Sequence, residues 1–285
     1  MKRVLKRTFN RFLPDALRDL IKRSLTAKSA PSVDINLVVE EVEPALRCTV
    51  DQSWSFLAPS VCRTSLANFT DSSEGRVEVQ NIARAARRGG ILFDVGAHSG
   101  LVSAMFCAAN SNNRAFSFEP SPILAKRILS VRELNRFGDR MSIEQVGIGE
   151  TSDTLEMMLD PAGGFIQPLH FDHTMWAAPE KISVQLESIP DAALRLGVTP
   201  QFIKIDIEGY EFEAIKGATD FLARYKPEVF LEVHLNYLEE RNRSAKALTG
   251  MLRQCGYNLY SLSGVPLKER DVYDSLLPIV HVVAR

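Results

Sequence analysis

The sequence predicts an α/β fold of the Rossmann-like type, a mostly parallel sheet with one antiparallel strand and helices on both faces. Three observations support this prediction. Apolar, strand-like runs alternate with helical segments from residue 91 to residue 255. A glycine-bearing turn joins the first of these runs directly to a helix, as in nucleotide-binding sheets. The last two runs follow each other without a clear helix between them, which favours one antiparallel strand.

Residues 1–74 are expected to form an extension that precedes an α/β domain of residues 75–285. Apolar positions at helical spacing over residues 2–25 predict two short helices, which Pro14 separates. Residues 1–28 hold nine Lys/Arg against two Asp, a local charge of +7, which leaves −8 for the rest of a chain whose net charge is −1. Such a basic amphipathic segment could lie on an anionic membrane surface, or pack on the domain with its basic face solvated. Both interpretations stay open.

The bulk composition fits a globular protein that can bury a full core, with 45% hydrophobic and 24% charged residues among 285. The acidic body argues against nucleic-acid binding. Four cysteines lie far apart without a C-x-x-C pair, so neither a zinc site nor a disulfide framework is indicated, and a reducing compartment fits best. No apolar run has the length of a membrane span, and no signal-peptide core is visible. We therefore expect a cytoplasmic protein, with peripheral contact at the inner face of the membrane through residues 1–28 as the variant.

The extension and the start of the domain contain further predicted elements. Short β-like runs at Ala45–Val50 and Trp54–Leu57 predict a hairpin ahead of the main sheet. Arg76–Arg88 is expected to form a helix that two glycines end. The central strand is Ile91–Val95, and a helix over Leu101–Ala109 follows the glycine turn.

The remaining elements follow from apolar runs and helical periodicity in chain order. They are a strand at 115–119, a helix from 122 to about 137, a strand at 141–146, β-like runs at 154–159 and 182–186, a strand at 202–207, a helix at 210–225, a strand at 228–233, a helix at 244–255, and strands at 257–262 and 279–283.

A long loop, from Pro161 to Pro179, is rich in Gly, Pro, His and Trp. A loop of this length in a compact domain is either functional or mobile, so this loop is the candidate for contact with a substrate. Its residues His170, His173 and Trp176 have no metal-ligand spacing, and we interpret the two histidines as loop residues rather than ligands.

The glycine turn and one distant acid predict the kind of nucleotide. Gly96 and Gly100 are four residues apart, with His98 between them and Asp94 ahead, instead of the G-x-G-x-x-G of dinucleotide sites. Glu119 ends the next strand about twenty residues later, where such sites hold ribose hydroxyls with a carboxylate. This combination resembles the S-adenosyl-L-methionine (AdoMet) pocket of class I methyltransferases.

Several strand ends carry polar residues or glycine, and parallel strands bring their carboxyl ends to one edge of a sheet, where ligands bind. These ends are Asp94, Glu119, Val146-Gly147, Asp206 with Glu208, and Glu232 with His234.

Over about residues 75–235 the sequence resembles the FkbM-type methyltransferases. The segments that carry this resemblance are Phe93–Gly100, Phe118–Pro122, Val146–Gly149, Leu186–Ile189, Phe202–Glu211 and Val229–His234. The I-K-I-D-x-E-G-x-E segment is the most specific of them. Two positions depart from the family pattern, because His98 stands where Asn is usual and Glu187 where Asp is usual.

The resemblance implies a seven-stranded class I methyltransferase sheet and AdoMet-dependent O-methylation of a hydroxyl on a sugar, polysaccharide or polyketide-like molecule. Carried over to this sequence, the turn of Asp94, Gly96, His98 and Gly100 would surround the amino-acid part of AdoMet. Glu119, followed by Pro120, would take the ribose hydroxyls. Gly147 and Ile148 would flank the adenine.

Methyl transfer to an alcohol gains from a base, for which Asp206, Glu208 and His234 are the candidates. Histidine has the ordinary pKa nearest neutrality, whereas a carboxylate needs its pKa raised by burial. The alternatives are structural: Asp206 and Glu208 could cap the following helix, and Asp94 could only shape the turn. Asp206, Glu208 and His234 could also hold Mg²⁺, but such sites leave no firm signature in a sequence, and we assign no metal.

Two other classes of function remain open at this point. An NAD(P)-dependent oxidoreductase could share the sheet, although the missing G-x-G-x-x-G argues against it. A non-catalytic binding or assembly protein could use a degenerate methyltransferase fold, although the intact set of Asp94, Glu119 and Asp206 argues against degeneracy. The acceptor and the oligomeric state are not predicted.

Overall fold

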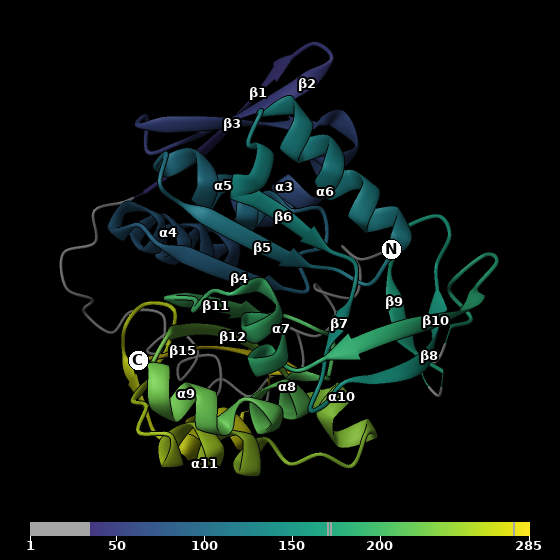
Figure 1. The fold of residues 1–285 in the computed structure, drawn as a ribbon, viewed down its shortest axis with the longest axis vertical. Coiled ribbons are helices and arrows are strands. Elements are labelled where there is room, and N and C mark those ends of the chain that lie inside the picture. Colours follow the sequence, from purple (N-terminus) through teal and green to yellow (C-terminus); the bar gives the residue numbers. More distant parts are fainter. Residues whose placement is uncertain (1–34, 170, 172, 276) are drawn as a thin grey trace, which may run out of the picture.

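The computed structural model describes residues 35–169, 171, 173–275 and 277–285, so the two helices predicted within residues 2–25 lie outside the described residues. In the described part, the main sheet has eight strands in the order β14-β13-β15-β12-β11-β4-β5-β6 (Figure 1). In this order, their bounds are Pro266–Leu267, Leu259–Tyr260, Ile279–Ala284, Glu228–His234, Phe202–Ile205, Ile91–Val95, Arg114–Phe118 and Met141–Glu144.

The sheet is mostly parallel, as predicted, because β12, β11, β4, β5 and β6 pair in parallel. The predicted count was wrong: β14 adds an eighth strand and runs, like β15, against the others. The chain moves outward from β4 through β5 to β6 and then returns to β11 on the other side of β4. This topological switch point makes the carboxyl ends of β4 and β11 the expected place for a ligand.

Helices cover both faces of the sheet (Figure 1). One face carries α4 (Ser73–Arg88), α5 (Leu101–Ala109) and α6 (Pro122–Leu134). The other carries α7, α8, α9 and α11, and short helices α10 and α12 complete this half. Their bounds are Ile189–Leu196, Glu211–Gly217, Thr219–Tyr225, Ala245–Gln254, Leu235–Glu240 and Glu269–Tyr273.

Side chains of the central strands alternate between two apolar cores. Leu92 and Phe202 belong to the core under α4 and α5, whereas Phe93 and Ile203 belong to the core under α8 and α11. This alternation is the period-two pattern of a strand buried on both faces, and it explains why the central strands are apolar almost throughout.

Caps and close contacts set the helix limits. Ser72 accepts a hydrogen bond from Gly75 N, so α4 begins three residues before the predicted start. The single helix predicted over residues 210–225 is two helices, α8 and α9. The break follows Gly217, where the carbonyl oxygen of Glu150 approaches so closely that a Cβ would lie 2.3 Å from it.

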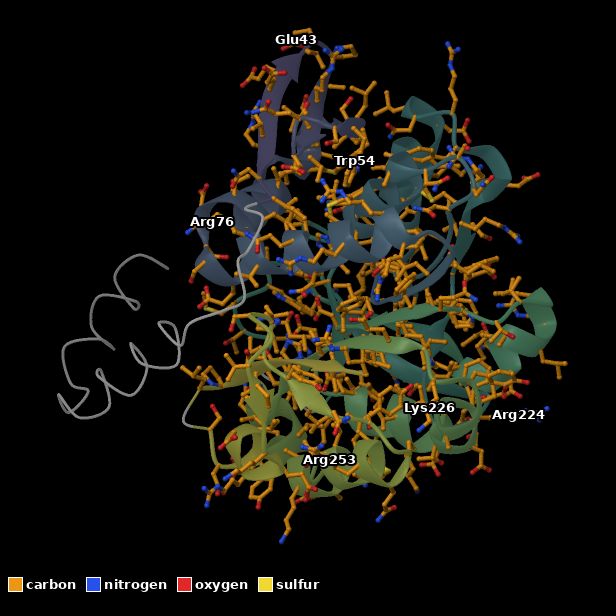
Figure 2. The ribbon with its side chains drawn as sticks, turned by 90° about the vertical axis from the view of Figure 1, so that its left-hand side faces the viewer. Glu43, Trp54, Arg76, Arg224, Lys226 and Arg253 are labelled. Carbon is orange, nitrogen blue, oxygen red and sulfur yellow. The ribbon has the colours of Figure 1, made fainter. Side chains whose placement is uncertain are left out.

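An antiparallel sheet of three strands, β1 (Leu37–Val42), β2 (Ala45–Val50) and β3 (Trp54–Pro59), replaces the predicted hairpin. The strand β1 was not predicted, because its two glutamates interrupt the apolar pattern. The sheet projects at one end of the molecule with Glu43 at its tip, opposite Arg253 of α11 (Figure 2). A short turn (η1, Ser60–Cys62) and α3 (Arg63–Asp71) lead back to the domain. Leu46 and Phe56 of the three-stranded sheet share an apolar core with α5. The domain limit at residue 74 stays a prediction.

A second sheet lies beside the carboxyl ends of β5 and β6 (Figure 1). It contains β7 (Gly147–Ile148), β8 (Asp153–Leu159), β9 (Ile166–Pro168) and β10 (Glu180–Glu187), in the order β7-β10-β8-β9. The strand predicted over residues 141–146 therefore ends early, after which the chain leaves the main sheet through β7. Among the described helices, none has the length and apolar character needed to cross a membrane.

Candidate active site

The glycine turn after β4 connects three strand ends. Gly96 N and Ala97 N both donate to Phe118 O at the end of β5, at 3.0 and 3.1 Å, and Asp206 N donates to Val95 O at 3.0 Å. Gly96 has φ +77°, and a Cβ there would lie 1.9 Å from the carbonyl oxygen of Asp206. Only glycine fits this position, so the turn holds the carboxyl ends of β4, β5 and β11 against one another.

Asp94 stabilises the start of α5 from the neighbouring strand. Its Oδ2 accepts hydrogen bonds from Ser103 N at 3.1 Å and Ser103 Oγ at 2.7 Å. The N-cap of this helix, Gly100, has no side chain to do so. The structural role considered for Asp94 is thus present. Its Oδ1 is buried without a hydrogen-bond partner among the described residues, so it keeps capacity for a donor from a ligand.

Glu119 is a buried carboxylate that orders the turn. Its Oε2 accepts from His98 N at 2.8 Å and its Oε1 from Ser121 N at 3.0 Å, so Glu119 and Pro120 connect the turn to α6. Burial raises the pKa of Glu119 to about 7. The two hydrogen bonds from backbone N–H groups oppose this shift in part. Each carboxylate oxygen has a second lone pair, and the group can still accept two hydroxyl donors.

His98 extends the turn toward the second sheet. Its backbone is left-handed, with φ +53°. Its Nδ1 lies 3.1 Å from Ser99 Oγ, and its ring centroid lies 5.5 Å from that of Phe165, the residue before β9. Burial lowers the pKa of His98, so its imidazole is neutral at neutral pH. His98, which stands where the family usually has Asn, therefore makes an aromatic contact with the long loop.

Gly147 and Ile148 lie on β7, beside Leu186 and Glu187 of β10. A Cβ on Gly147 would lie 2.6 Å from Leu186 Cδ2, so a larger residue there would require the Leu186 side chain to move. Glu187, the other departure from the family pattern, binds Arg195 at 2.5 and 3.1 Å. Arg195 also binds Glu144 at the end of β6, at 2.8 Å, and so connects the two sheets.

Charged residues occupy the face of the main sheet that α4 covers, near its carboxyl edge. On this face Leu92, Phe202 and Phe230 belong to the apolar core, and two residues further along each strand come Asp94, Lys204 and Glu232. Asp94 and Lys204 pair in register with Phe230, so Glu232 lies two residues nearer the carboxyl edge. Another two residues along, β11 leads to Asp206, and β12 ends at His234. We call the following residues the charged cluster: Lys204, Asp206, Glu208, Glu211, Glu232 and His234.

The imidazole of His234 lies at the centre of the charged cluster. Its Nδ1 is 2.8 Å from Oε1 of the buried Glu211, which also accepts from Gly209 N at 3.0 Å. Its Nε2 is 3.6 Å from Glu208 Oε2, 3.6 Å from Glu232 Oε1 and 3.9 Å from Asp206 Oδ1. The structure thus brings the three sequence-predicted catalytic residues together, but the acid that orients the imidazole is Glu211 rather than Asp206.

The charges of neighbouring groups determine the protonation states of His234 and Asp206. Burial alone would lower the pKa of His234, but the hydrogen bond and the charge of Glu211, with Glu208 and Asp206, raise it to about 9. Because its pKa lies above 7, this imidazole is protonated at neutral pH and is a poor proton acceptor there. Burial likewise opposes ionisation of Asp206, but the charges of Lys204 and His234 and the hydrogen bond to Lys204 together hold the pKa of Asp206 below its ordinary value.

Lys204 is a buried lysine within the I-K-I-D segment. Its Nζ lies 3.0 Å from Asp206 Oδ2 and 3.9 Å from Glu78 Oε1 of α4. Burial would lower the pKa of the amine, but Asp206, Glu78 and the other nearby carboxylates raise it above its ordinary value, so it stays charged. Burial raises the pKa of Glu78 to about 7 against the charge of Lys204.

The turn after β11 has two left-handed residues in succession, Glu208 at φ +52° and Gly209 at φ +98°. Such a conformation is strained for glutamate and is found most often at functional sites. Arg241 holds the turn by donating to Gly209 O, while its guanidinium lies 3.5 Å from the Tyr210 ring centroid. Within the described chain, neither Asp206 nor Glu208 caps α8 through its side chain, so the capping alternative is not observed.

The long loop reaches the charged cluster through a stack of rings. Phe171 lies 4.7 Å from Tyr237, whose ring is stacked on His234 at 5.7 Å. His173 instead lies 4.9 Å from Trp176, with its buried Nε2 lacking a hydrogen-bond partner in the described part. His170 lies outside the described residues. The loop predicted to contact a substrate therefore contacts His98 directly and is connected to His234 through Tyr237.

Sequence reasoning assigned no role to Lys204, Glu211 or Glu78. Two of them had a detectable signal. The alternation of Phe202, Lys204 and Asp206 places all three on one face of a strand, and Glu211 is the last acid of the I-D-x-E-G-x-E segment. Glu78 had none, because a glutamate on an amphipathic helix is ordinarily solvated.

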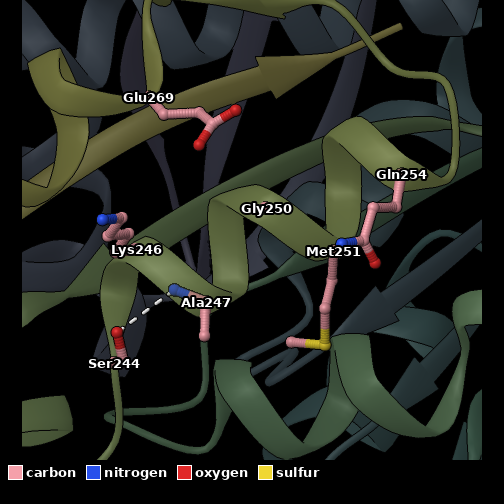
Figure 3. Close-up of a pocket in the computed structure, with 7 residues that line it drawn as sticks. All are labelled: Ser244, Lys246, Ala247, Gly250, Met251, Gln254 and Glu269. Atoms are coloured by element: carbon pink, nitrogen blue, oxygen red, sulfur yellow. Dashed lines mark hydrogen bonds between the residues drawn. The ribbon is translucent and has the colours of Figure 1, made fainter.

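Two surface hollows lie elsewhere. One follows α11, lined by Lys246, Met251 and Glu269 among others (Figure 3). The second, near Arg88 and Glu228, lies at the opposite edge of the sheet, where β11 and β12 begin. None of the sequence-predicted site residues lines either hollow. The converging donors and acceptors at the carboxyl edge are the stronger indication of a site.

Comparisons with known proteins agree with this location. The methyltransferase FkbM domain matches residues 94–259, which include every residue assigned to the turn and the whole charged cluster. A search of curated proteins gives no significant match. A solved structure of a methyltransferase FkbM from Methylobacillus flagellatus KT is similar at 20% identity and a TM-score of 0.44, covering 69% of this chain and 43% of that chain. The similar region thus spans less than half of that longer protein.

Two further solved structures are similar. A precorrin-6y C5,15-methyltransferase from Geobacter metallireducens GS-15 has 13% identity and a TM-score of 0.39, covering 73% of this chain and 86% of that chain. A SAM-dependent methyltransferase from Agrobacterium tumefaciens has 8% identity and a TM-score of 0.42, covering 86% and 70%.

Proposed function

The chain belongs to the FkbM family of AdoMet-dependent methyltransferases, and we propose that it methylates a hydroxyl group at the carboxyl edge of its main sheet. Because the chain belongs to this family, we propose a methyltransferase rather than the oxidoreductase or non-catalytic protein that were the alternatives. The observation that supports this location most strongly is the contact between the glycine turn and the charged cluster. Gly96 lies directly against the backbone of Asp206, so a cofactor held by the turn is adjacent to the charged groups.

The residues of the turn fit AdoMet. Glu119 keeps two carboxylate lone pairs for ribose hydroxyls, and Asp94 Oδ1 is a buried acceptor without a partner among the described residues. Gly96 and Gly100 allow the left-handed, closely packed turn that brings these groups to one edge, because a Cβ on Gly96 would meet Asp206 O and one on Gly100 would meet Met141 and Ile128. We assign the cofactor site to Asp94, Gly96, His98, Gly100, Glu119, Pro120, Gly147 and Ile148. When bound there, AdoMet supplies a methyl group on a sulfonium.

The chain's own contribution is to position a hydroxyl and to accept its proton. Glu208 is the best acceptor in the charged cluster, because its side chain is 43% exposed and its turn is held in a strained conformation. In the described part of the chain, no hydrogen bond occupies its carboxylate. Asp206 and the protonated His234 lie within 4 Å of each other and are proposed to position the hydroxyl oxygen.

The long loop favours an acceptor with an apolar part. Phe165, Leu169 and Met175 of this loop are exposed, although Phe165 also contacts His98. Because the loop contacts His98 and the Tyr237 ring that is stacked on His234, an acceptor bound there would meet apolar side chains near its hydroxyl. This supports a polyketide-like acceptor or a sugar carried on an apolar group.

Replacing Glu208 by Gln tests the proposed proton acceptor. With a hydroxyl compound that the enzyme methylates, Glu208→Gln is expected to lower kcat by roughly 10²–10⁴ while AdoMet affinity stays near wild type. The matched control is Glu239→Gln on the exposed surface of α10, which should leave kcat unchanged. Full turnover by Glu208→Gln would show that another group accepts the proton.

A further inference from the structure

We propose that Asp206, Glu232 and His234 form a binding site for a divalent first-row transition-metal ion such as Mn²⁺. One oxygen or nitrogen from each of the three lies within 4.8 Å of the others. The set differs from the Asp206, Glu208 and His234 considered from the sequence, because Glu232 takes the place of Glu208. Ion binding does not depend on the proposed function. Only the use of the ion in methyl transfer rests on that proposal.

The distances suit a shared ion. His234 Nε2 lies 3.6 Å from Glu232 Oε1 and 3.9 Å from Asp206 Oδ1. Two ligand atoms at about 2.1 Å from one ion lie about 3.0 Å apart at a right angle and about 4.2 Å apart when opposite. Both observed separations fall between these limits. They exceed hydrogen-bond length, and Nε2 has no hydrogen bond in the described part of the chain although His234 is only 2% exposed.

Two of the three side chains, His234 and Asp206, are held from behind by a charged group, and the third, Glu232, has the imidazole of His281 nearby. Nδ1 of His234 is bound to Glu211 at 2.8 Å, so Nε2 is the nitrogen aimed at the acids. The other oxygen of Asp206, Oδ2, is bound to Lys204 at 3.0 Å, and Oε2 of Glu232 lies 3.8 Å from His281 Nδ1. Partners that orient ligands in this way, above all a carboxylate on the far nitrogen of a histidine, are typical of metal sites.

Negative charge is in excess around the three ligands. The two cations Lys204 and His234 face six carboxylates, those of Glu78, Asp94, Asp206, Glu208, Glu211 and Glu232. A bound divalent cation would offset this excess more fully than protons on the same carboxylates.

The ligand types favour one class of ion. Carboxylates alone suit Mg²⁺ or Ca²⁺, whereas an imidazole suits the first-row transition metals, and Mn²⁺ accepts both. A Mn²⁺ ion here would replace the proton on His234 Nε2. It would then take over the positioning of the acceptor hydroxyl from that N–H and would favour loss of the hydroxyl proton. That proton would pass to Glu208, the oxygen would form its bond to the methyl carbon, and the C–S bond would break with its electron pair left on sulfur as S-adenosylhomocysteine (AdoHcy).

The test is Mn²⁺ binding to the full-length protein without AdoMet, measured by the loss of the free-ion paramagnetic resonance signal. We expect one ion per chain and at least tenfold weaker binding in both Glu232→Gln and Asp206→Asn. The matched control is Glu228→Gln, a partly buried glutamate at the opposite end of the same strand β12, paired with Arg88. It should bind Mn²⁺ as the wild type does.

Thermal unfolding keeps the test decisive if a variant is less stable. Mn²⁺ should raise the Tm of the wild type and of Glu228→Gln, and leave that of Glu232→Gln unchanged. Absence of Mn²⁺ binding by wild-type protein that still binds AdoHcy would overturn the metal site and leave the proposed function intact. Equal loss of binding in Glu228→Gln would also overturn it, and the cluster would then be an ion-pair network around a protonated His234.

Discussion

At the scale of single residues, the site is built from buried carboxylates that each stabilise local structure and keep capacity to bind a ligand. Asp94 holds α5, Glu119 holds the glycine turn, and Glu211 holds both Gly209 and His234. Each retains an oxygen lone pair beyond its structural hydrogen bonds. Replacing one of these residues is therefore expected to affect ligand binding and local structure together.

The raised pKa of Glu119 predicts that AdoHcy binding depends on pH. Ribose hydroxyls bind the carboxylate, and the pKa of about 7 means that this form is a minority at pH 6 and dominant at pH 8. We expect about tenfold weaker AdoHcy binding at pH 6 than at pH 8 by calorimetry. In Glu119→Gln the dependence should flatten. A wild-type dissociation constant that is the same at both values would contradict the assignment.

Whether a site residue could be predicted from the sequence depended on its position along its strand. Asp94, Glu119, Asp206 and His234 were visible because each stands at the carboxyl end of an apolar run, and parallel strands bring those ends together. The alternation along its strand places Lys204 on the same face as Asp206, but its role could not be predicted, because a lysine inside a buried strand is compatible with the fold only when carboxylates surround it. Those carboxylates come from β4, β11, β12 and α4, and no local pattern shows such an assembly.

At the scale of elements, the packing of the turn after β4 against the turn after β11 determines the geometry of the site. Gly96→Ala would put a Cβ 1.9 Å from the carbonyl oxygen of Asp206 and require φ +77° of an alanine. We expect a loss of about 2–5 kcal/mol in the free energy of unfolding, measured by chemical denaturation, with AdoHcy binding weakened in whatever protein folds.

The matched control for Gly96→Ala is Gly250→Ala in α11, where no atom lies within 4 Å of the added Cβ. Alanine in a helix interior should stabilise the protein by about 0.5–1 kcal/mol. If Gly96→Ala were as stable as Gly250→Ala, the close approach of the two turns would be wrong.

Elements with strong local signals were predicted to the residue. The strand β4 and the helix α5 have the expected limits, because an apolar run, a glycine turn and an amphipathic stretch follow one another directly. The departure of β7 into a second sheet was missed, because two residues, Gly147 and Ile148, are too few to give a strand pattern of their own. What defines this strand is tertiary, because β7 pairs with Leu186 and Glu187 of β10, far along the chain.

At the scale of the whole molecule, the described chain is a doubly covered sheet with two additions, the three-stranded sheet at one end and the second sheet beside the carboxyl edge. The basic residues 1–28 lie outside the described part, and their charge is the basis of a separate prediction. A variant lacking them should bind AdoHcy like the full chain. The full chain alone should co-sediment with anionic vesicles, more strongly at low salt. Equal sedimentation of both would favour a segment that packs on the domain.

The central claim is that the carboxyl edge around Gly96 and Glu119 holds AdoMet. Calorimetry of AdoHcy and NADH with the wild-type protein and Glu119→Ala tests it most directly. We predict that the wild type binds one AdoHcy per chain and no NADH. Binding of AdoHcy to a folded Glu119→Ala should be roughly ten- to a hundredfold weaker, or about 1.5–3 kcal/mol, because the hydroxyls lose their charged acceptor. Unchanged AdoHcy binding in that variant, or binding of NADH instead, would contradict the claim.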